Sequence, residues 1–146
     1  MGAPLLVETL RGLEVGSVRP VPQSGEPSFC RTIRREDGEI DWALDAGGLS
    51  RRLRAYTPWP GLFTFLDGER IKILNAAPGP APRPGEPGAL WSEDGKLYAS
   101  AGGGSSLELR SLQRAGRNAV SGAEFARSLK MPARFGRFGR FGHSPA

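Results

Sequence analysis

The side chains best suited to chemistry in this 146-residue chain are guanidinium groups. An Arg side chain is planar, permanently charged and able to bind two phosphate oxygens at once, so it favours polyanionic ligands. Such groups recur along the chain, together with one tryptophan between two prolines. The candidate RNA-binding residues are Arg31, Arg34, Arg35, Arg51, Arg54, Trp59, Lys72, Arg114, Arg117, Arg127 and Lys130. Contacts of this kind would position an RNA by its backbone without identifying its bases.

The net charge of +5 is concentrated at the C-terminal end. From residue 114 onward, seven Arg and Lys residues are accompanied by one acidic residue, Glu124. A basic segment favours a nucleic-acid partner, with an anionic membrane surface as the second choice. The competing interpretation is a solvated surface, in which the upstream cations are partly balanced by Glu36, Asp37 and Asp41.

Trp59 stands between Pro58 and Pro60. Its ring could stack on a nucleobase, a contact that contributes about 1–3 kcal/mol per base. It could also pack at the mouth of the domain, which is the interpretation that we favour. Trp42 and Tyr56 are expected to be core residues.

No residue pattern predicts a catalytic, cofactor-binding or metal-binding site. Asp41 and Asp45 are four residues apart without a histidine or metal partner, so we discard a catalytic role for them. Residues 102–104 are three glycines that lack the Lys-Ser/Thr of a phosphate loop, and they favour a hairpin turn. The single histidine, His143, lies in a repetitive tail.

The sequence predicts a cytoplasmic protein. One cysteine, Cys30, excludes an intrachain disulfide and fits a reducing compartment. No run of about 18 apolar residues predicts a membrane span, and no basic segment followed by an apolar run predicts a signal peptide.

The elements that must position these side chains begin with a short helix at residues 3–14. Its apolar positions at helical spacing are Leu6, Leu10 and Leu13. A helix this short is marginal in water, so the apolar stripe needs a partner. We therefore interpret residues 1–15 as the last helix of a missing upstream domain. Residues 16–35 form a Pro- and Gly-containing linker.

Residues 45–56 predict an amphipathic helix with Asp45 as its cap. The apolar period then changes from helical to alternating, with turn residues between short runs. The expected strands are residues 62–66, 70–74, 89–92, 96–100 and 106–113. Residues 76–88 predict a loop between two hairpins. Five short strands favour a small antiparallel barrel, because closure removes exposed edges.

The C-terminal part predicts one more helix, near residues 122–130. Ser121 and Glu124 form a capping box at its start. Residues 132–146 are expected to be disordered, and they contain three Arg-Phe-Gly repeats that begin at Arg134. Alternating Arg and Phe is typical of RNA-associated segments, but an inert end explains the repeats equally well.

Several strings resemble, in order, the C-terminal domain of methionyl-tRNA formyltransferases. The matching strings are Asp37-Gly38-Glu39-Ile40-Asp41-Trp42, Leu53-Arg54-Ala55-Tyr56-Thr57-Pro58-Trp59-Pro60-Gly61, Arg70-Ile71-Lys72-Ile73, Pro87-Gly88, residues 107–113 and Gly116-Arg117. The resemblance spans roughly residues 2–130. It implies a mainly β fold, an OB-like Greek-key antiparallel barrel with flanking helices, at residues 36–131.

This resemblance implies a partner, initiator methionyl-tRNA, which the full enzyme formylates with 10-formyltetrahydrofolate. In the family that reaction uses Asn, His and Asp in an N-terminal domain whose motifs do not occur in this sequence. We therefore expect this chain to hold no cofactor or metal, to be inactive alone and to be a monomer. Given the resemblance, we favour phosphate contact by part of the cationic set.

Two departures from the family pattern concern the basic residues. The family usually has a Gly, two basic residues and a Met where this sequence has Gly116-Arg117-Asn118-Ala119-Val120. One charge is therefore missing there, which weakens the expected contact. The Arg-Phe-Gly repeats are not a family feature.

Two other classes of function stay open. The domain could belong to a related formyltransferase that acts on a sugar nucleotide or folate, where the barrel would be an architectural wall without RNA binding. It could also be a decayed fragment that survives as an interaction domain.

Overall fold

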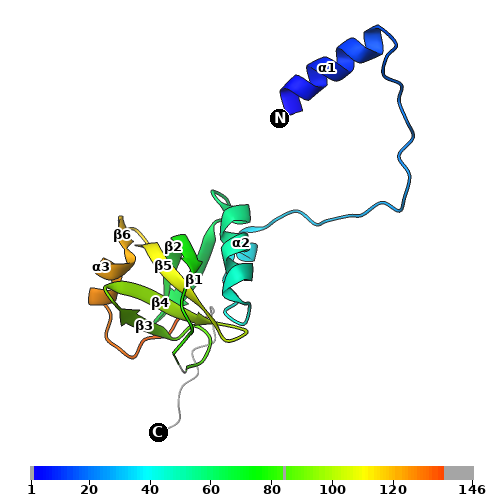
Figure 1. Ribbon diagram of the computed structural model, residues 1–146. Helices are drawn as coiled ribbons and strands as arrows, with labels where there is room; N and C mark the ends of the chain where they lie inside the picture. Colours follow the sequence, from blue (N-terminus) through cyan, green and yellow to red (C-terminus); the bar gives the residue numbers. More distant parts are fainter. Residues whose placement is uncertain (1, 84, 137–146) are drawn as a thin grey trace. The chain divides into compact units, whose positions relative to one another are not determined.

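The computed structural model describes residues 2–83 and 85–136, and it divides into two compact units after Arg31 (Figure 1). The first unit holds helix α1 (Gly2–Glu14) and the second holds every strand. Within the described ranges, no helix has the length and apolarity needed to cross a membrane.

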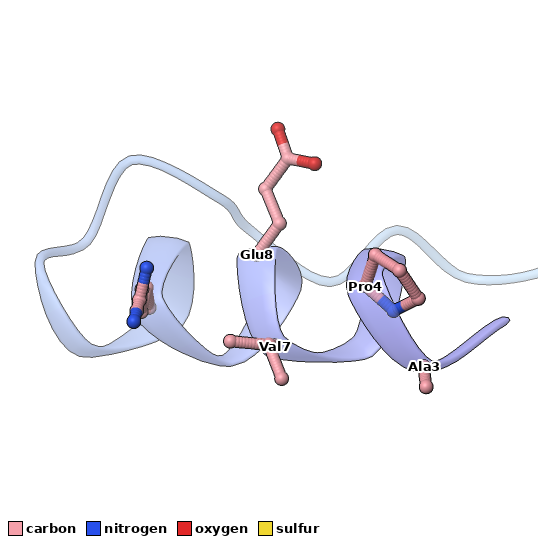
Figure 2. A pocket seen from close by; sticks show the side chains of 5 residues that line it. Ala3, Pro4, Val7 and Glu8 are labelled. Atoms are coloured by element: carbon pink, nitrogen blue, oxygen red, sulfur yellow. The ribbon is translucent and has the colours of Figure 1, made fainter. Parts of the chain in front are cut away.

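Helix α1 occupies the positions expected for the N-terminal helix. The chain turns back at its end, where Ser17 and Val18 both donate backbone N–H groups to the carbonyl of Gly12. Figure 2 shows Ala3 and Val7 projecting from one side of α1 and Glu8 from another. The leucines expected to need a partner are exposed, with Leu6 58% and Leu10 55% accessible. Residues 17–34 have no regular structure.

The second unit is an antiparallel sheet with helices on its sides, as the sequence predicts. Its elements are the 3-10 helix η1 (Arg35–Gly38), α2 (Ala46–Tyr56), β1 (Leu62–Leu66), β2 (Glu69–Pro78), β3 (Leu90–Glu93), β4 (Lys96–Ala101), β5 (Ser105–Arg114), β6 (Ala119–Ser121) and α3 (Gly122–Arg127). The strand order is β1-β2-β5-β4-β3, with β6 paired to β5. Helix α2 packs against β1, β2 and β5, whereas α3 packs against the strands from β3 to β6 (Figure 1).

Two element boundaries and one additional strand differ from the sequence-based expectation. Strand β2 continues to Pro78, into the predicted loop, because β5 pairs with it as far as Leu107. The short strand β6 was not predicted. Helix α3 ends at Arg127 rather than near residue 130. In each case the deciding hydrogen bonds come from a segment distant in sequence or from a local turn that periodicity does not encode.

The core lies inside the barrel and under α2. Ile71 and Ile73 are buried while Lys72 between them is exposed, so the alternation predicted for this strand is confirmed. A polar relay crosses the core: the indole Nε1 of Trp42 donates to Thr64 Oγ1 at 3.0 Å, and Thr64 Oγ1 donates to the carbonyl of Gly136 at 3.0 Å.

The start of the Arg-Phe-Gly tail closes the barrel, so the prediction of disorder is wrong for residues 134–136. Leu90 N–H donates to the carbonyl of Ala133 at 2.9 Å, and Gly136 and Phe65 exchange backbone hydrogen bonds at 2.8 and 3.2 Å. The segment therefore connects the β3 edge to the β1 edge. Open strand edges present unpaired backbone groups, and this segment satisfies them. The repeats after Gly136 lie outside the described residues.

Phe135 fixes this closing segment from within. Its side chain is 1% exposed, and its ring stacks on Trp42 with centroids 5.5 Å apart and planes 16° apart. Its backbone N–H donates to the carbonyl of Gly88 at 2.9 Å. A phenyl group that looks like part of a low-complexity repeat is therefore a core residue.

We expect Phe135→Ala to lower the free energy of unfolding by about 3–5 kcal/mol, because it leaves a cavity against Trp42. Urea denaturation measured by tryptophan fluorescence would give this value. Phe29→Ala is the matched control, since Phe29 is 92% exposed and its removal leaves no cavity. A loss of less than about 1 kcal/mol for Phe135→Ala would show that the segment does not close the barrel.

Candidate nucleic-acid interface

The basic side chains of the barrel fall into two classes. One class is neutralised by nearby carboxylates, largely around β3, β4 and the adjoining part of β5. These ion pairs are Arg83–Glu93 at 3.2 Å, Lys96–Glu108 at 3.9 Å, Arg110–Glu108 at 3.2 Å, Arg134–Glu86 and Arg114–Glu69. In the second class no carboxylate of the described residues lies within ion-pair distance, and its members include Arg35, Arg54, Arg70, Lys72 and Arg117.

Arg70 is the centre of the second class. Its guanidinium carbon lies 3.8 Å from the centroid of the Phe63 ring, on the outer face of the β1–β2 hairpin. Its Nε atom is buried and has no hydrogen-bond partner among the described residues. Desolvation, and then the nearby positive charge of Arg35, lower the pKa of Arg70. Two like charges thus lie close together, and no carboxylate of the described residues is within ion-pair distance of either.

Lys72 continues this surface toward β5. It shares the outer face of β2 with Arg70, because side chains two residues apart in a strand point the same way. Its Cα partner on β5 is Gln113, whose side-chain Nε2 donates to the carbonyl of Arg117 at 2.9 Å. Lys72 and Arg117 are both exposed. These contacts connect Arg35, Arg70 and Lys72 across neighbouring elements, whereas the Arg117 side chain lines a depression that also contains Glu124.

Helix α2 adds a further cation beside β2. Arg54 lines a shallow groove together with Leu74, the next outward residue of β2 after Lys72. The Arg54 guanidinium donates to Ser50 Oγ at 3.1 Å and keeps its charge exposed. We call the surface formed by Arg35, Arg54, Arg70 and Lys72 the cationic face.

Trp59 lies on the surface, so the expectation that it packs is wrong. Its side chain is 60% exposed, whereas Trp42 is 4% exposed, as expected for a core residue. The exposure follows from local backbone structure, because the loop after α2 folds back on itself. Gly61 N–H donates to the carbonyl of Tyr56 at 2.9 Å.

The remaining candidates are placed differently. Arg114 is half-buried, paired with Glu69 and 4.8 Å above the Phe125 ring, so its charge is already balanced. Lys130 lines a depression that also contains Asp67. Arg127 and Arg51 are exposed on their helices.

The two basic residues before η1 have separate positions. Arg34 precedes η1, and its backbone N–H donates to the carboxylate of Asp37 at 2.7 Å. Arg31 belongs to the first unit.

Arg70 is a residue of the cationic face that the sequence-based candidates did not include. The signal was present, because the same alternation that exposes Lys72 exposes the residue two positions before it. What the sequence does not reveal is that Glu69, adjacent to Arg70, pairs with Arg114 and so leaves Arg70 without an acid.

The acidic residues considered for catalysis have structural roles. Asp45 accepts the backbone N–H of Gly48 at 2.6 Å as the cap of α2. Asp41 accepts the backbone N–H of Ala43 at 3.2 Å. Across residues 2–83 and 85–136, no cluster of three or more His, Cys, Asp or Glu side chains could hold a metal ion.

A shallow depression lies on α1 and has an open, mostly apolar lining. Figure 2 shows Pro4 and Val7 beside it, with the carboxylate of Glu8 extended away. It contains no nucleophile paired with a base, so it offers no catalytic arrangement.

A solved structure and several methionyl-tRNA formyltransferases are similar to this chain. HypX from Aquifex aeolicus has the same fold over 86% of this chain and 23% of its own, with a TM-score of 0.60 and 22% identity. Methionyl-tRNA formyltransferase from Anaeromyxobacter dehalogenans strain 2CP-1 is 42% identical over 134 residues, and that from Paenarthrobacter aurescens strain TC1 is 38% identical over 133.

These alignments cover 89% and 91% of this chain and 43% of each relative, so the chain spans less than half of their length. The model of the formyl transferase C-terminal domain matches residues 32–130, which include η1, α2, the whole sheet and α3. The chain therefore belongs to the formyl transferase C-terminal domain family.

Proposed function

We propose that this chain is the tRNA-binding C-terminal part of a methionyl-tRNA formyltransferase. The observation that carries the proposal is the cationic face, where charges from η1, α2 and β2 lie on neighbouring elements and lack carboxylate partners among the described residues. Placing like charges together costs free energy that a phosphate backbone offsets.

In this proposal the barrel docks initiator methionyl-tRNA and does not react with it. Formyl transfer from 10-formyltetrahydrofolate to the methionyl amine would take place in a catalytic domain outside this sequence. Guanidinium groups on the cationic face would bind phosphate oxygens and so fix the orientation of the RNA. The role belongs to translation initiation in the cytoplasm.

The competing candidate is a wall for a small-molecule site. It is favoured by the fold shared with HypX, one structure of which contains tetrahydrofolic acid, with a TM-score of 0.57. A wall has no need for unneutralised cations on an outer surface, so the cationic face supports RNA docking over this candidate. RNA binding discriminates between the two.

We expect the purified full chain to bind tRNA at low salt with an affinity that falls steeply as salt rises. Neutralising roughly four or five phosphates releases their counter-ions, and each contributes about −0.7 to −0.9 to the slope of log affinity against log salt. Fluorescence anisotropy over a salt series measures this slope. An affinity that stays flat over the series would contradict phosphate docking.

A pair of lysine variants tests whether tRNA binding depends on the position of a cation or on the net charge of the chain. Lys72→Ala removes one charge from the cationic face, and we expect weaker tRNA binding with a salt slope reduced by about one unit. Lys96→Ala is the matched control, because Lys96 is also exposed on a strand but lies 3.9 Å from Glu108. Equal losses for both variants would indicate attraction by net charge and exclude a defined interface.

A further inference from the structure

Trp59 is the exposed tryptophan of this chain, and it stands on a loop with little freedom to move. Both neighbours are prolines, which fix their own φ angles. At the start of the loop, the Thr57 hydroxyl donates to the carbonyl of Leu53 at 2.6 Å, and at its end Gly61 N–H donates to Tyr56. An aromatic ring presented by a restrained loop loses little conformational entropy when it binds.

The loop also packs against η1, which brings it next to the cationic face. A Cβ atom placed on Gly38 would lie 2.2 Å from the carbonyl oxygen of Gly61, so the two backbones are in direct contact. Arg35 begins η1, and Arg54 lies in the last turn of α2, immediately before the loop. An exposed ring on a loop between two elements that carry guanidinium groups matches a nucleotide, with its flat base and its charged phosphate.

We propose that Trp59 is a stacking platform for an unpaired base of the bound RNA. This inference rests on the proposed function and adds a second component to it, since phosphate contacts alone do not distinguish single strands from duplexes. Bases inside a duplex have both faces covered by their neighbours, so the partner of the ring in this proposal is an unpaired base. The interface would then prefer an RNA with a single-stranded extension beside its stem.

The surface chemistry argues against a protein partner for this ring. The cations of the neighbouring elements repel Arg, which is enriched at protein interfaces, and attract phosphate instead. The ring is also isolated from other large apolar groups on its loop, because Tyr56 is half-buried beneath the guanidinium of Arg52, 5.9 Å from the ring centroid.

The test uses the full chain and two RNA hairpins, one blunt-ended and one carrying an unpaired 3′ extension. We expect Trp59→Ala to weaken binding of the extended hairpin roughly five- to hundredfold, the range that corresponds to stacking of one base. Trp59→Phe should recover part of the loss. Binding of the blunt hairpin and the salt slope should stay near the wild-type values. Phe29→Ala, which removes another exposed aromatic ring, is the matched control.

Fluorescence gives a second, independent measurement. Trp42 and Trp91 are 4% and 7% exposed, so quenching by acrylamide reports mainly on Trp59. The extended hairpin should protect it from the quencher, and the blunt hairpin should not. Equal binding of the extended hairpin by wild type and Trp59→Ala would overturn the stacking site while leaving phosphate docking intact. If neither hairpin binds at low salt, the proposed function fails as well.

Discussion

The constraint on which this structure depends is the pairing of two sheet edges. The strand path β1-β2-β5-β4-β3 leaves β1 and β3 with outward-facing backbone groups. The segment at residues 133–136 pairs with both, through Leu90 and Phe65, and inserts Phe135 against Trp42. Because the same segment accepts the Thr64 hydroxyl, backbone pairing, aromatic packing and the buried polar relay are satisfied together. The closed barrel then gives η1, β2 and α2 fixed relative positions.

Charge is distributed unevenly over this rigid frame. Glu108 neutralises both Lys96 and Arg110 on one side, whereas Arg70 lies over an aromatic ring beside Arg35. Surface ion pairs contribute little to stability, so the value of the pairing is mainly to cancel local potential. A ligand phosphate near Arg70 would supply the negative charge that no carboxylate of the described residues supplies there. The barrel therefore separates a surface with balanced charges from one whose cations lack carboxylate partners among the described residues.

The family match does not extend to the segment that closes the barrel. The matching model covers residues 32–130 and ends before Phe135, so the closing segment lies beyond the part recognised as the family domain. The first phenylalanine of the Arg-Phe-Gly repeats, Phe135, is part of the hydrophobic core, and its side chain is 1% exposed. Phenylalanine suits this position because it fills the space beside Trp42.

The sequence alone determined the features that arise from local periodicity and capping. It predicts the β1–β2 and β3–β4 hairpins, the alternation of Ile71, Lys72 and Ile73, and the Ser121–Glu124 capping box, because neighbours within a few residues encode them. Only the tertiary structure decided which charges are balanced, since Glu69 reaches Arg114 from 45 residues away. It also decided the exposure of Trp59 and the burial of Phe135. Burial and pairing depend on surfaces brought together from distant parts of the chain, and a linear pattern does not contain that information.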